Sequence, residues 1–456
     1  MQGETRWSVP PLLVMPDSPL LQALASSILA GEAAAEKIIA RLSRSLGRRW
    51  RWIGPLAQRY LKAFAARTRP RQSVVVEFLR HDRGFRSAWS KHGSEISIGH
   101  WLSEPMRMQP VAAAKRWNLP AIESIKDLAA FLALTPRELF WFADLKGLGY
   151  KQDPEKLHHY HYRALPKTNG DIRLIEAPKP RTKQLQQQIL SGILEKVPTH
   201  PSAHGFVKGR SIKTFTAPHV GQRVVLRMDL KQFFPSFRAA RIQTIFRTMG
   251  YPEPVADLLG GICTNCTPRE VWNKYGLEAD YDCRWQARVL YCRPHLPQGA
   301  PTSPALANLC THRADCRLSG LAKTVGARYT RYADDLAFSG DSGFERGIER
   351  FSTHVAAILI EEGFHVHHRK TRVMRQGVRQ HLAGVVVNRH LNIMRSDFDR
   401  LKATLTNCVR LGPESQNLDT HADFRSHLEG HINFVEMINP TKGNRLRRIF
   451  EQIEWN

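Results

Sequence analysis

The alternation of apolar and polar positions predicts a β-hairpin that carries two acids at its tip. Tyr329 to Tyr332 and Leu336 to Phe338 have the composition of two short strands, and Asp334 and Asp335 lie between them. Successive residues of a strand point to opposite faces, so both carboxylates can meet one partner only if a tight turn joins the strands. We therefore predict a turn over Ala-Asp-Asp. An exposed acidic turn without a ligand is the simpler interpretation of this segment alone.

A second apolar segment predicts a strand that ends on an acid. Val224 to Leu230 is β-branched and apolar, carries Asp229 near its end and is followed by a break at Pro235. A carboxylate at the end of a buried strand is costly unless a cation meets it, although a single aspartate also caps many turns. Two close carboxylates repel, and a divalent cation offsets that repulsion. Together the two segments indicate a site for two Mg²⁺ ions of the kind used in nucleotidyl transfer.

Capping signals and apolar periodicity predict further helices, a hairpin and a strand along the chain. Ser18-Pro19 is a good helix start, and apolar residues follow at helical spacing. Thr135 and Glu138 form a predicted capping box with Pro136 at the first helical position. We also expect a hairpin around Asn169-Gly170, helices over 184–194, 304–318 and 344–362, a strand over 364–368, and helices from residue 395 onward.

Composition points to a polyanionic partner. Lys and Arg number 67 against 41 Asp and Glu, which gives a formal net charge of +26. Such an excess favours nucleic acid, because binding phosphates releases counterions. No uninterrupted apolar run approaches membrane-spanning length, so we expect no membrane association. The odd count of seven cysteines in a large chain favours a reducing compartment, and we expect a cytoplasmic protein.

Two groups of basic residues are candidate nucleic-acid contacts. In the first, arginines alternate with tryptophans, which suits phosphate pairing and base stacking. The same pattern also fits a solvated helix face with Trp50 and Trp52 packed inward. The second group lies near the end of the chain and would grip a duplex backbone or an RNA stem. The candidates are Arg48, Arg49 and Arg51 in the first group, and Lys442, Arg445 and Arg448 in the second.

Four cysteines form a candidate zinc site. Cys263 and Cys266 have zinc-ligand spacing, but Cys283 and Cys292 do not repeat it. Cys263 follows an apolar segment and equally fits a buried, small apolar position. Both interpretations of the cluster stay open.

Four motifs in consistent order resemble those of reverse transcriptases, and within that family the bacterial retron-type enzymes. They are Tyr332-Ala-Asp-Asp335, Asp229 with Phe233-Phe234, Leu296 to Pro304, and Ala203 to Ser211. The resemblance covers about the last three quarters of the chain. Two subgroup features depart from the retron pattern, because Leu382-Ala383-Gly384 replaces Val-Thr-Gly and Thr216 replaces an asparagine. A retron-like or other defence-associated relative therefore fits as well as a standard retron enzyme.

The resemblance implies roles for individual residues. Asp229, Asp334 and Asp335, with the backbone of Leu230, would hold two Mg²⁺ ions. Lys370 matches a family lysine proposed to protonate pyrophosphate, although a phosphate-binding lysine would look identical. The remaining candidates contact the incoming deoxynucleotide: Lys167 and Arg173 at its triphosphate, Gln298 and Gly299 beneath it, and Phe234 as the steric gate that excludes a ribose 2′-hydroxyl.

The implied fold is α+β, a right-hand polymerase with fingers, an antiparallel palm and a helical thumb. We expect a basic, mostly helical extension over 1–118, a helical lead-in and fingers over 119–222, a palm over 223–394 with an insertion at 263–295, and a thumb over 395–456. Such an enzyme copies RNA into DNA from dNTPs.

If the chain is retron-like, its partners would be a structured noncoding RNA that serves as template and primer, the DNA product and a possible defence effector protein within an anti-phage system. Alternatives are a group II intron-type maturase and a defence enzyme that makes DNA by protein-primed or template-independent synthesis. A non-catalytic RNA-binding protein would need broken palm motifs, and all three acids are present.

Overall fold

The structure is a computed structural model that describes residues 18–64, 69–101, 106–148, 158–166, 172–268, 270–271 and 289–455. It is a mixed arrangement of helices and β-sheets with a helical N-terminal region, as the sequence predicts. The chain divides into two units, one of residues 1–197 and 238–302 and the other of residues 198–237 and 303–456. Each unit is described by itself.

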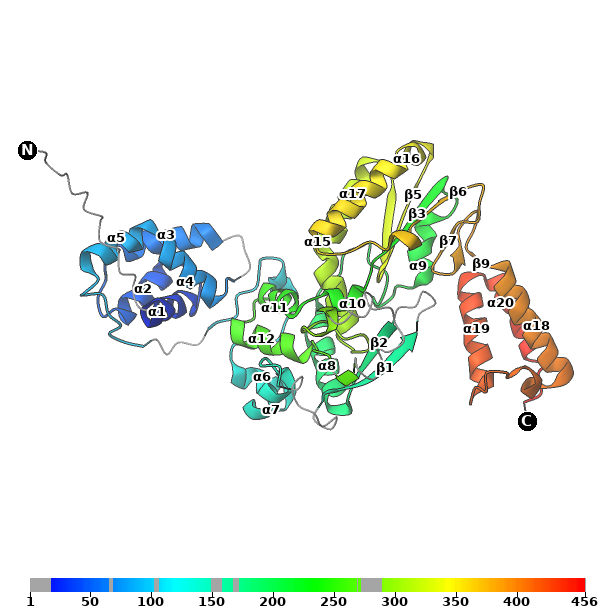
Figure 1. Ribbon diagram of the computed structural model, residues 1–456, viewed down its shortest axis with the longest axis horizontal. Helices are drawn as coiled ribbons and strands as arrows, with labels where there is room; N and C mark the ends of the chain where they lie inside the picture. Colours follow the sequence, from blue (N-terminus) through cyan, green and yellow to red (C-terminus); the bar gives the residue numbers. More distant parts are fainter. Residues whose placement is uncertain are drawn as a thin grey trace, which may run out of the picture. The chain divides into compact units, whose positions relative to one another are not determined.

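The first unit opens with helices that bury a core of their own (blue in Figure 1). The core contains the fully buried side chains of Leu21, Leu24, Ile38 and Leu56. The helical spacing of apolar residues after Ser18 predicts such a buried face. The helices are α1 Ser18–Leu29, α2 Ala35–Ser45, α3 Ile53–Phe64, α4 Gln72–His81 and α5 Arg83–His92.

The rest of the first unit combines short helices with one hairpin. Strand β1, Tyr160–Pro166, pairs antiparallel with β2, Ile172–Pro178, as predicted. The capping box of Thr135 and Glu138 is present at the start of its helix. The helices are α6 Ile125–Leu132, α7 Pro136–Ala143, α8 Pro180–Gly192, α11 Ala239–Thr248 and α12 Glu253–Ile262, with 3₁₀ turns at Ala114–Arg116 and Leu194–Lys196.

The second unit is built on a four-stranded antiparallel sheet in the order β4-β5-β3-β6. Its strands are β4 Arg328–Tyr332, β5 Asp335–Gly340, β3 Val224–Asp229 and β6 Arg372–Arg375. Side chains alternate between the two faces. Phe338 packs on Phe351 of a covering helix, whereas its neighbour Ala337 packs with Phe215 on the other face.

Helices cover both faces of this sheet (Figure 1). The face of Phe338 lies under α15 Ser303–Thr324 and α17 Ile348–Glu361, and α16 Ser342–Arg346 packs at the end of β5. Phe215 belongs to α9, Ile212–Thr216, which the 3₁₀ turn Ala217–His219 follows. The helical turn α10 Phe233–Ser236 follows β3, and a 3₁₀ turn at His368–Lys370 precedes β6.

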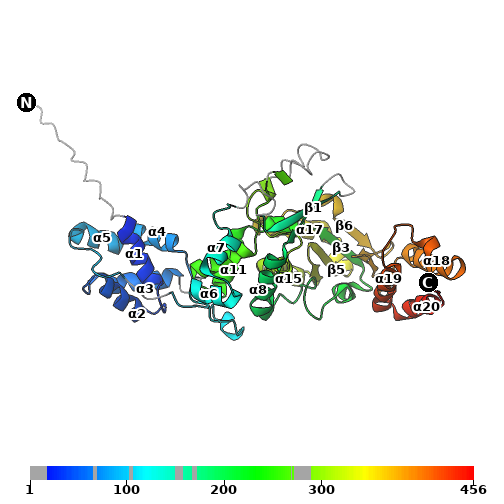
Figure 2. The same ribbon diagram turned by 90° about the horizontal axis from the view of Figure 1, so that it is seen from below.

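The chain continues into a small sheet and a helical bundle. Strands β7 His381–Leu382, β8 Val385–Val386 and β9 Asn392–Ile393 form a three-stranded antiparallel sheet in the order β7-β8-β9. Helices α18 Arg395–Leu411, α19 Phe424–Ile438 and α20 Pro440–Phe450 then share one apolar core, with a 3₁₀ turn at Pro413–Gln416 (Figure 2). The helical prediction from residue 395 onward is confirmed.

Some sequence-based predictions are wrong in detail. The helix expected over 344–362 is interrupted at Gly347, because glycine is a weak helix former and α16 ends there. The strand expected over 364–368 is reduced to one bridge between Val366 and Leu230, followed by the 3₁₀ turn. Pro235 lies inside α10 rather than marking the break itself. None of the described helices has the length and apolar character required to cross a bilayer.

Candidate active site

Strand pairing brings the three candidate acids to one end of the sheet. Asp229, the last residue of β3, stands directly opposite Asp335, the first residue of β5. Asp334 lies in the two-residue turn between β4 and β5, where Ala333 has a left-handed φ of 54°. The amide of Leu230 donates to the main-chain oxygen of Asp334 at 3.0 Å, which ties the turn to the end of β3. The predicted hairpin with acids at its tip is therefore present.

Two cations hold two of these carboxylates. Arg227, two residues before Asp229 on β3, donates from Nε and Nη2 to Oδ1 of Asp335 at 3.0 and 2.8 Å. Lys370 Nζ lies 3.1 and 3.2 Å from the two carboxylate oxygens of Asp229. The segment of Lys370 is fixed by the amide of His367, which donates to the main-chain oxygen of Asp229 at 2.7 Å. Lys370, predicted from its motif alone, thus lies beside the acids.

The electrostatics of the turn favour a cation. Burial, followed by the negative charges of Asp229 and Asp335, raises the pKa of Asp334 to about 6. Burial also raises the pKa of Asp335, and Arg227 opposes that rise. Three carboxylates and the nearby main-chain oxygen of Leu230 are the hard oxygen donors that Mg²⁺ prefers. As they stand, no three His, Cys, Asp or Glu side chains of the described residues are grouped closely enough to hold an ion. Arg227 contacts only Oδ1 of Asp335, whereas Lys370 contacts both carboxylate oxygens of Asp229.

A buried arginine, which sequence reasoning missed, supports the turn from behind. Arg331 in β4 has no exposed surface and donates to both carboxylate oxygens of Asp315 in α15 at 2.8 and 2.7 Å. The same guanidinium donates to Asn308 Oδ1 at 3.0 Å and to the main-chain oxygen of Ala333 at 3.1 Å. Tyr329 adds a hydrogen bond to Asp315 at 2.8 Å. This pair therefore fixes the residue that precedes Asp334.

The segment of Ala203 to Ser211 packs against the same turn. The amide of His204 donates to the main-chain oxygen of Arg331, and the amide of Arg331 donates to that of Ser202, both at 2.7 Å. Asn308 Nδ2 donates to the main-chain oxygen of Gly205 at 2.9 Å. A Cβ atom on Gly205 would lie 2.6 Å from the amide nitrogen of Ala333. The motif is thus a backbone support that leaves no room for a side chain at Gly205.

The two phenylalanines after β3 have different surroundings. Phe233 is buried and packs against Phe237 and Phe364. Phe234 is only partly buried, and its ring centroid lies 6.3 Å from that of Phe206. Phe206 is exposed, has a left-handed φ of 60°, and also lies 6.3 Å from Tyr332. Phe233 is therefore a core residue, and Phe206 is a further aromatic residue that the sequence did not single out.

His219, three residues after Thr216, has a structural role. Its ring is buried beneath the hairpin, with Nδ1 2.6 Å from Ser339 Oγ and Nε2 2.7 Å from Thr330 Oγ1. Burial lowers the pKa of His219 to about 3, so the ring is neutral at pH 7. It therefore joins β4 and β5 below the turn.

Of the other candidate nucleotide-binding residues, Arg173, Gln298 and Gly299 belong to the first unit, whereas Phe234 belongs to the second. Arg173 lies exposed on β2, whereas Lys167 is outside the described residues. Gln298 is the last residue of the loop His295 to Gln298, and Gly299 follows it. The loop is attached to β2, since the amide of Glu176 donates to the main-chain oxygen of Gln298 at 2.9 Å. Gly299 has φ +131°, and a Cβ atom there would lie 2.9 Å from the main-chain oxygen of Glu176. Glycine is required at this position by both its conformation and its close contact.

The cysteines and the basic groups remain predictions. Burial raises the pKa of Cys263 and of Cys266 to about 12, and Cys266 donates from Sγ to the main-chain oxygen of Cys292 at 3.1 Å. Cys283 lies outside the described residues.

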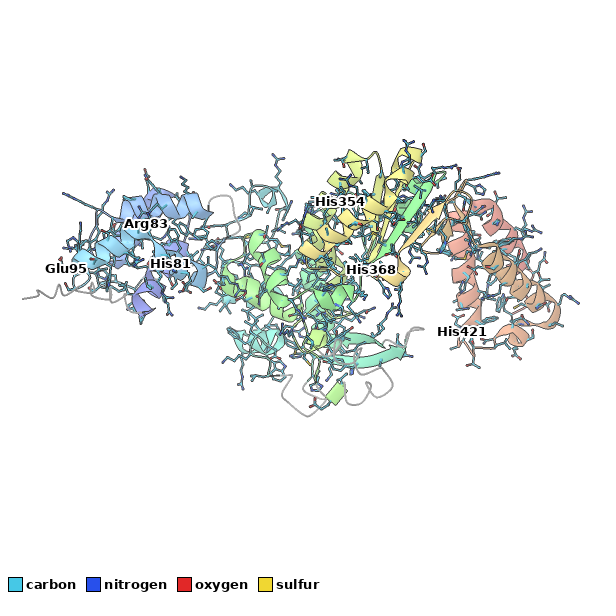
Figure 3. All side chains as sticks on the ribbon, turned by 45° about the horizontal axis from the view of Figure 1, so that its top comes forward. His81, Arg83, Glu95, His354, His368 and His421 are labelled. Atoms are coloured by element: carbon cyan, nitrogen blue, oxygen red, sulfur yellow. The ribbon has the colours of Figure 1, made fainter. Side chains whose placement is uncertain are left out.

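In the first basic group, Arg48 stacks on Trp50 at 3.6 Å and pairs with Glu95, which Figure 3 labels. Trp50 and Trp52 pack against the core of the N-terminal helices, while Arg49 and Arg51 are exposed. In the second group Lys442 lies 4.8 Å from the ring of Phe398, and Arg445 and Arg448 are exposed.

Comparison with known proteins identifies relatives over most of the chain. Residues 165–393 match a family model described as reverse transcriptase (RNA-dependent DNA polymerase). The retron Mx65 reverse transcriptase of Myxococcus xanthus is 41% identical over 341 residues, which are 74% of this chain and 73% of the relative. The retron Mx162 enzyme of the same organism is 34% identical over 82% of this chain and 77% of its own length. The retron Ec86 reverse transcriptase of Escherichia coli is 27% identical over 74% and 91%.

Proposed function

This chain belongs to the retron reverse transcriptases and is an RNA-directed DNA polymerase, and from that premise we propose that Asp229, Asp334 and Asp335 form its polymerisation site. The observation that carries the proposal is the pairing of Asp229 with Asp335 across β3 and β5, with Asp334 in the adjoining turn. Acids from segments about a hundred residues apart meet at one sheet end, where burial makes uncompensated charge costly.

Two divalent cations, with Mg²⁺ as the expected ion, would activate the attacking 3′-hydroxyl and stabilise the leaving pyrophosphate when bound. The three aspartates and the main-chain oxygen of Leu230 would hold them. Arg227 keeps Asp335 oriented in the absence of other partners, and the Arg331–Asp315 pair keeps the turn in place. These contacts would hold the turn and the end of β3 in place, and cation binding would bring the three carboxylates together.

Further candidate residues would select and bind the nucleotide. Phe234, partly exposed at the end of β3, would occupy the space of a ribose 2′-hydroxyl, as its position five residues after Asp229 suggests. Arg173 and Lys167 would pair with the triphosphate, and Gln298 and Gly299 would lie beneath the base and sugar. The close contact of Gly299 with the main chain of Glu176 would hold this backbone in a defined position for that role.

Lys370 has two roles that the geometry permits. Its ammonium, 3.1 Å from Asp229, would be well placed to protonate the leaving pyrophosphate or to bind its phosphates as a fixed charge. Its side chain is 53% exposed, so it is free to leave Asp229 for a phosphate oxygen.

The template would be a structured noncoding RNA that also primes synthesis, and the protein would act in an anti-phage defence system with an effector partner. The support is the retron identity of the relatives and the net charge of +26. Recognition of such an RNA would rest on shape and on 2′-hydroxyl contacts. Arg445 and Arg448 offer exposed charge for that contact.

Asp334→Asn tests the site. It keeps the size of the side chain but removes the charge, so DNA synthesis should be lost while RNA binding, measured by filter retention, stays nearly unchanged. Asp341→Asn is the matched control, because Asp341 follows the opposite end of β5 and asparagine caps a helix as well as aspartate does. Full polymerase activity in Asp334→Asn would refute the assignment.

The nature of the product tests the template. Nucleic acid that copurifies with the full chain should be sequenced before and after alkaline hydrolysis. Covalently linked RNA and DNA would support the proposal. DNA of random sequence joined to protein would instead indicate protein-primed, template-independent synthesis.

A further inference from the structure

A fully buried cluster of hydrogen-bonded polar side chains joins β2 to the loop that contains Gln298. Glu176 of β2 has no exposed surface, and its Oε1 accepts from Asn265 Nδ2 at 2.7 Å and from Thr267 Oγ1 at 2.8 Å. Its Oε2 lies 2.8 Å from His295 Nε2, and His295 is also fully buried. A buried carboxylate persists only when its hydrogen bonds are satisfied. The cluster is therefore a specific arrangement and not a chance contact.

Both ring nitrogens of His295 face acceptors. Nε2 faces the Glu176 carboxylate, and Nδ1 lies 2.8 Å from the main-chain oxygen of Arg293. The backbone of His295 exchanges two hydrogen bonds with Asn265, at 2.9 and 3.0 Å. Tyr291 packs edge-on against the ring at 4.9 Å. The histidine is thus fixed in position and orientation.

Glu176 holds this loop at both ends. Its side chain binds His295, the first residue of the four-residue segment His295 to Gln298, and its amide binds the main-chain oxygen of Gln298. Its own main-chain oxygen is the atom that leaves no room for a Cβ on Gly299. Arg173 lies three positions earlier on the same strand, on the opposite, exposed side.

We propose that Glu176 and His295 are a positioning pair: their contact fixes the position and orientation of Gln298 and Gly299 relative to β2, so that these two residues can bind the incoming deoxynucleotide. This rests on the nucleotide role of Gln298 stated under the proposed function. Without the histidine side chain, the loop loses its tether, the side-chain contact with Glu176, and keeps its main-chain hydrogen bonds, between His295 and Asn265 and between Gln298 and Glu176. Nucleotide binding then weakens, whereas binding of the RNA and the chemical step do not change.

Three variants separate positioning from stability. His295→Leu removes the tether and leaves the Glu176 charge without one partner, so both the melting temperature and the affinity for dNTP should fall. Glu176→Gln keeps the tether, because a neutral His295 donates from Nδ1 to Arg293 and accepts at Nε2 from the new amide. The double variant His295→Leu/Glu176→Gln removes the buried charge and also lacks the side-chain contact between positions 176 and 295, while the main-chain hydrogen bonds of the loop remain.

The KM for dNTP and kcat should be measured by primer extension on an RNA template, beside the melting temperature. We expect a near-normal KM for Glu176→Gln. In the double variant the melting temperature should recover relative to His295→Leu, while the KM stays raised about tenfold at an unchanged kcat. If the KM returns to normal with the melting temperature, the pair is only structural and the inference is wrong.

Gln298→Ala distinguishes this failure from a failure of the proposed function. It should raise the KM for dNTP, and adding the double variant should raise it no further, because coupled residues are not additive. If Gln298→Ala raises the KM and the double variant does not, the inference fails and the role of Gln298 stands. If Gln298→Ala leaves the KM unchanged, the role of Gln298 fails and the inference fails with it.

Discussion

Replacing Gly205 with alanine should displace the turn that carries Asp334. The new Cβ atom would lie 2.6 Å from the amide nitrogen of Ala333 and 3.2 Å from the carbonyl carbon of Tyr332, whereas ordinary contacts begin at 3.4 Å. Gly205 is not among the residues with a positive φ, so alanine suffers no backbone strain of its own. The effect comes from the contact alone.

The required movement is the difference between 3.4 and 2.6 Å, or 0.8 Å, between two backbone segments. Neither yields easily, because Arg331 holds Ala333 and Asn308 holds Gly205. Overpacking of this kind costs about 1–3 kcal/mol of the free energy of unfolding. A shift of about 1 Å in a catalytic group lowers the rate about 100-fold. We therefore expect a large loss of kcat with a modest loss of stability.

The assay is single-turnover addition of one dNTP at saturating Mg²⁺ and nucleotide, with thermal unfolding and RNA binding measured on the same samples. Gly320→Ala is the matched control. It makes the same change on the exposed face of α15, where a Cβ meets nothing within 4 Å, and should stabilise the helix by about 0.5–1 kcal/mol at normal activity. A folded Gly205→Ala protein with a normal rate would show that the turn does not depend on this contact.

Two further predictions concern the substrate and the cation. Phe234→Ala should admit ribonucleotides, so the preference for dGTP over GTP in primer extension should fall at least about tenfold, while Phe206→Ala should leave it unchanged; an unaltered preference would exclude Phe234 as the gate. Because burial and its acidic neighbours raise the pKa of Asp334 to about 6, the Mg²⁺ concentration for half-maximal synthesis should rise as pH falls through 6 and level off above about pH 7. The free energy of unfolding depends on pH in the opposite direction. Without the cation, the pKa of Asp334 is higher in the folded protein than in the unfolded chain, so the free energy of unfolding falls as pH rises from about 4 to about 6. A Mg²⁺ requirement independent of pH between 5 and 8 would contradict the assignment.

Local patterns in the sequence were sufficient to predict the acid-bearing hairpin. The alternating residues on both sides of Asp334 define β4 and β5, and the apolar run before Asp229 defines β3. The capping box at Thr135 was equally readable, because all its atoms come from four consecutive residues. Such features depend on neighbours in the chain, which is where periodicity and capping rules apply.

The supporting contacts could not be predicted in this way. Glu176 and His295 are 119 positions apart, and nothing in either segment marks the other as a partner. Arg227 was a polar residue within an apolar strand, which was the available signal for its pairing with Asp335. Gly347 was also visible, but whether a glycine interrupts a helix depends on what packs on each side of it. These outcomes are decided by tertiary packing.

The Arg331–Asp315 pair has a consequence for how related sequences diverge. The guanidinium and the carboxylate are both fully buried. Replacing either one alone leaves an unpaired buried charge, which lowers the free energy of unfolding by about 3–5 kcal/mol. Mutational steps through such an intermediate are penalised, and the two positions, 16 residues apart, should be inherited as one unit. Homologues that carry an uncharged residue at one of them are expected to carry an uncharged residue at the other.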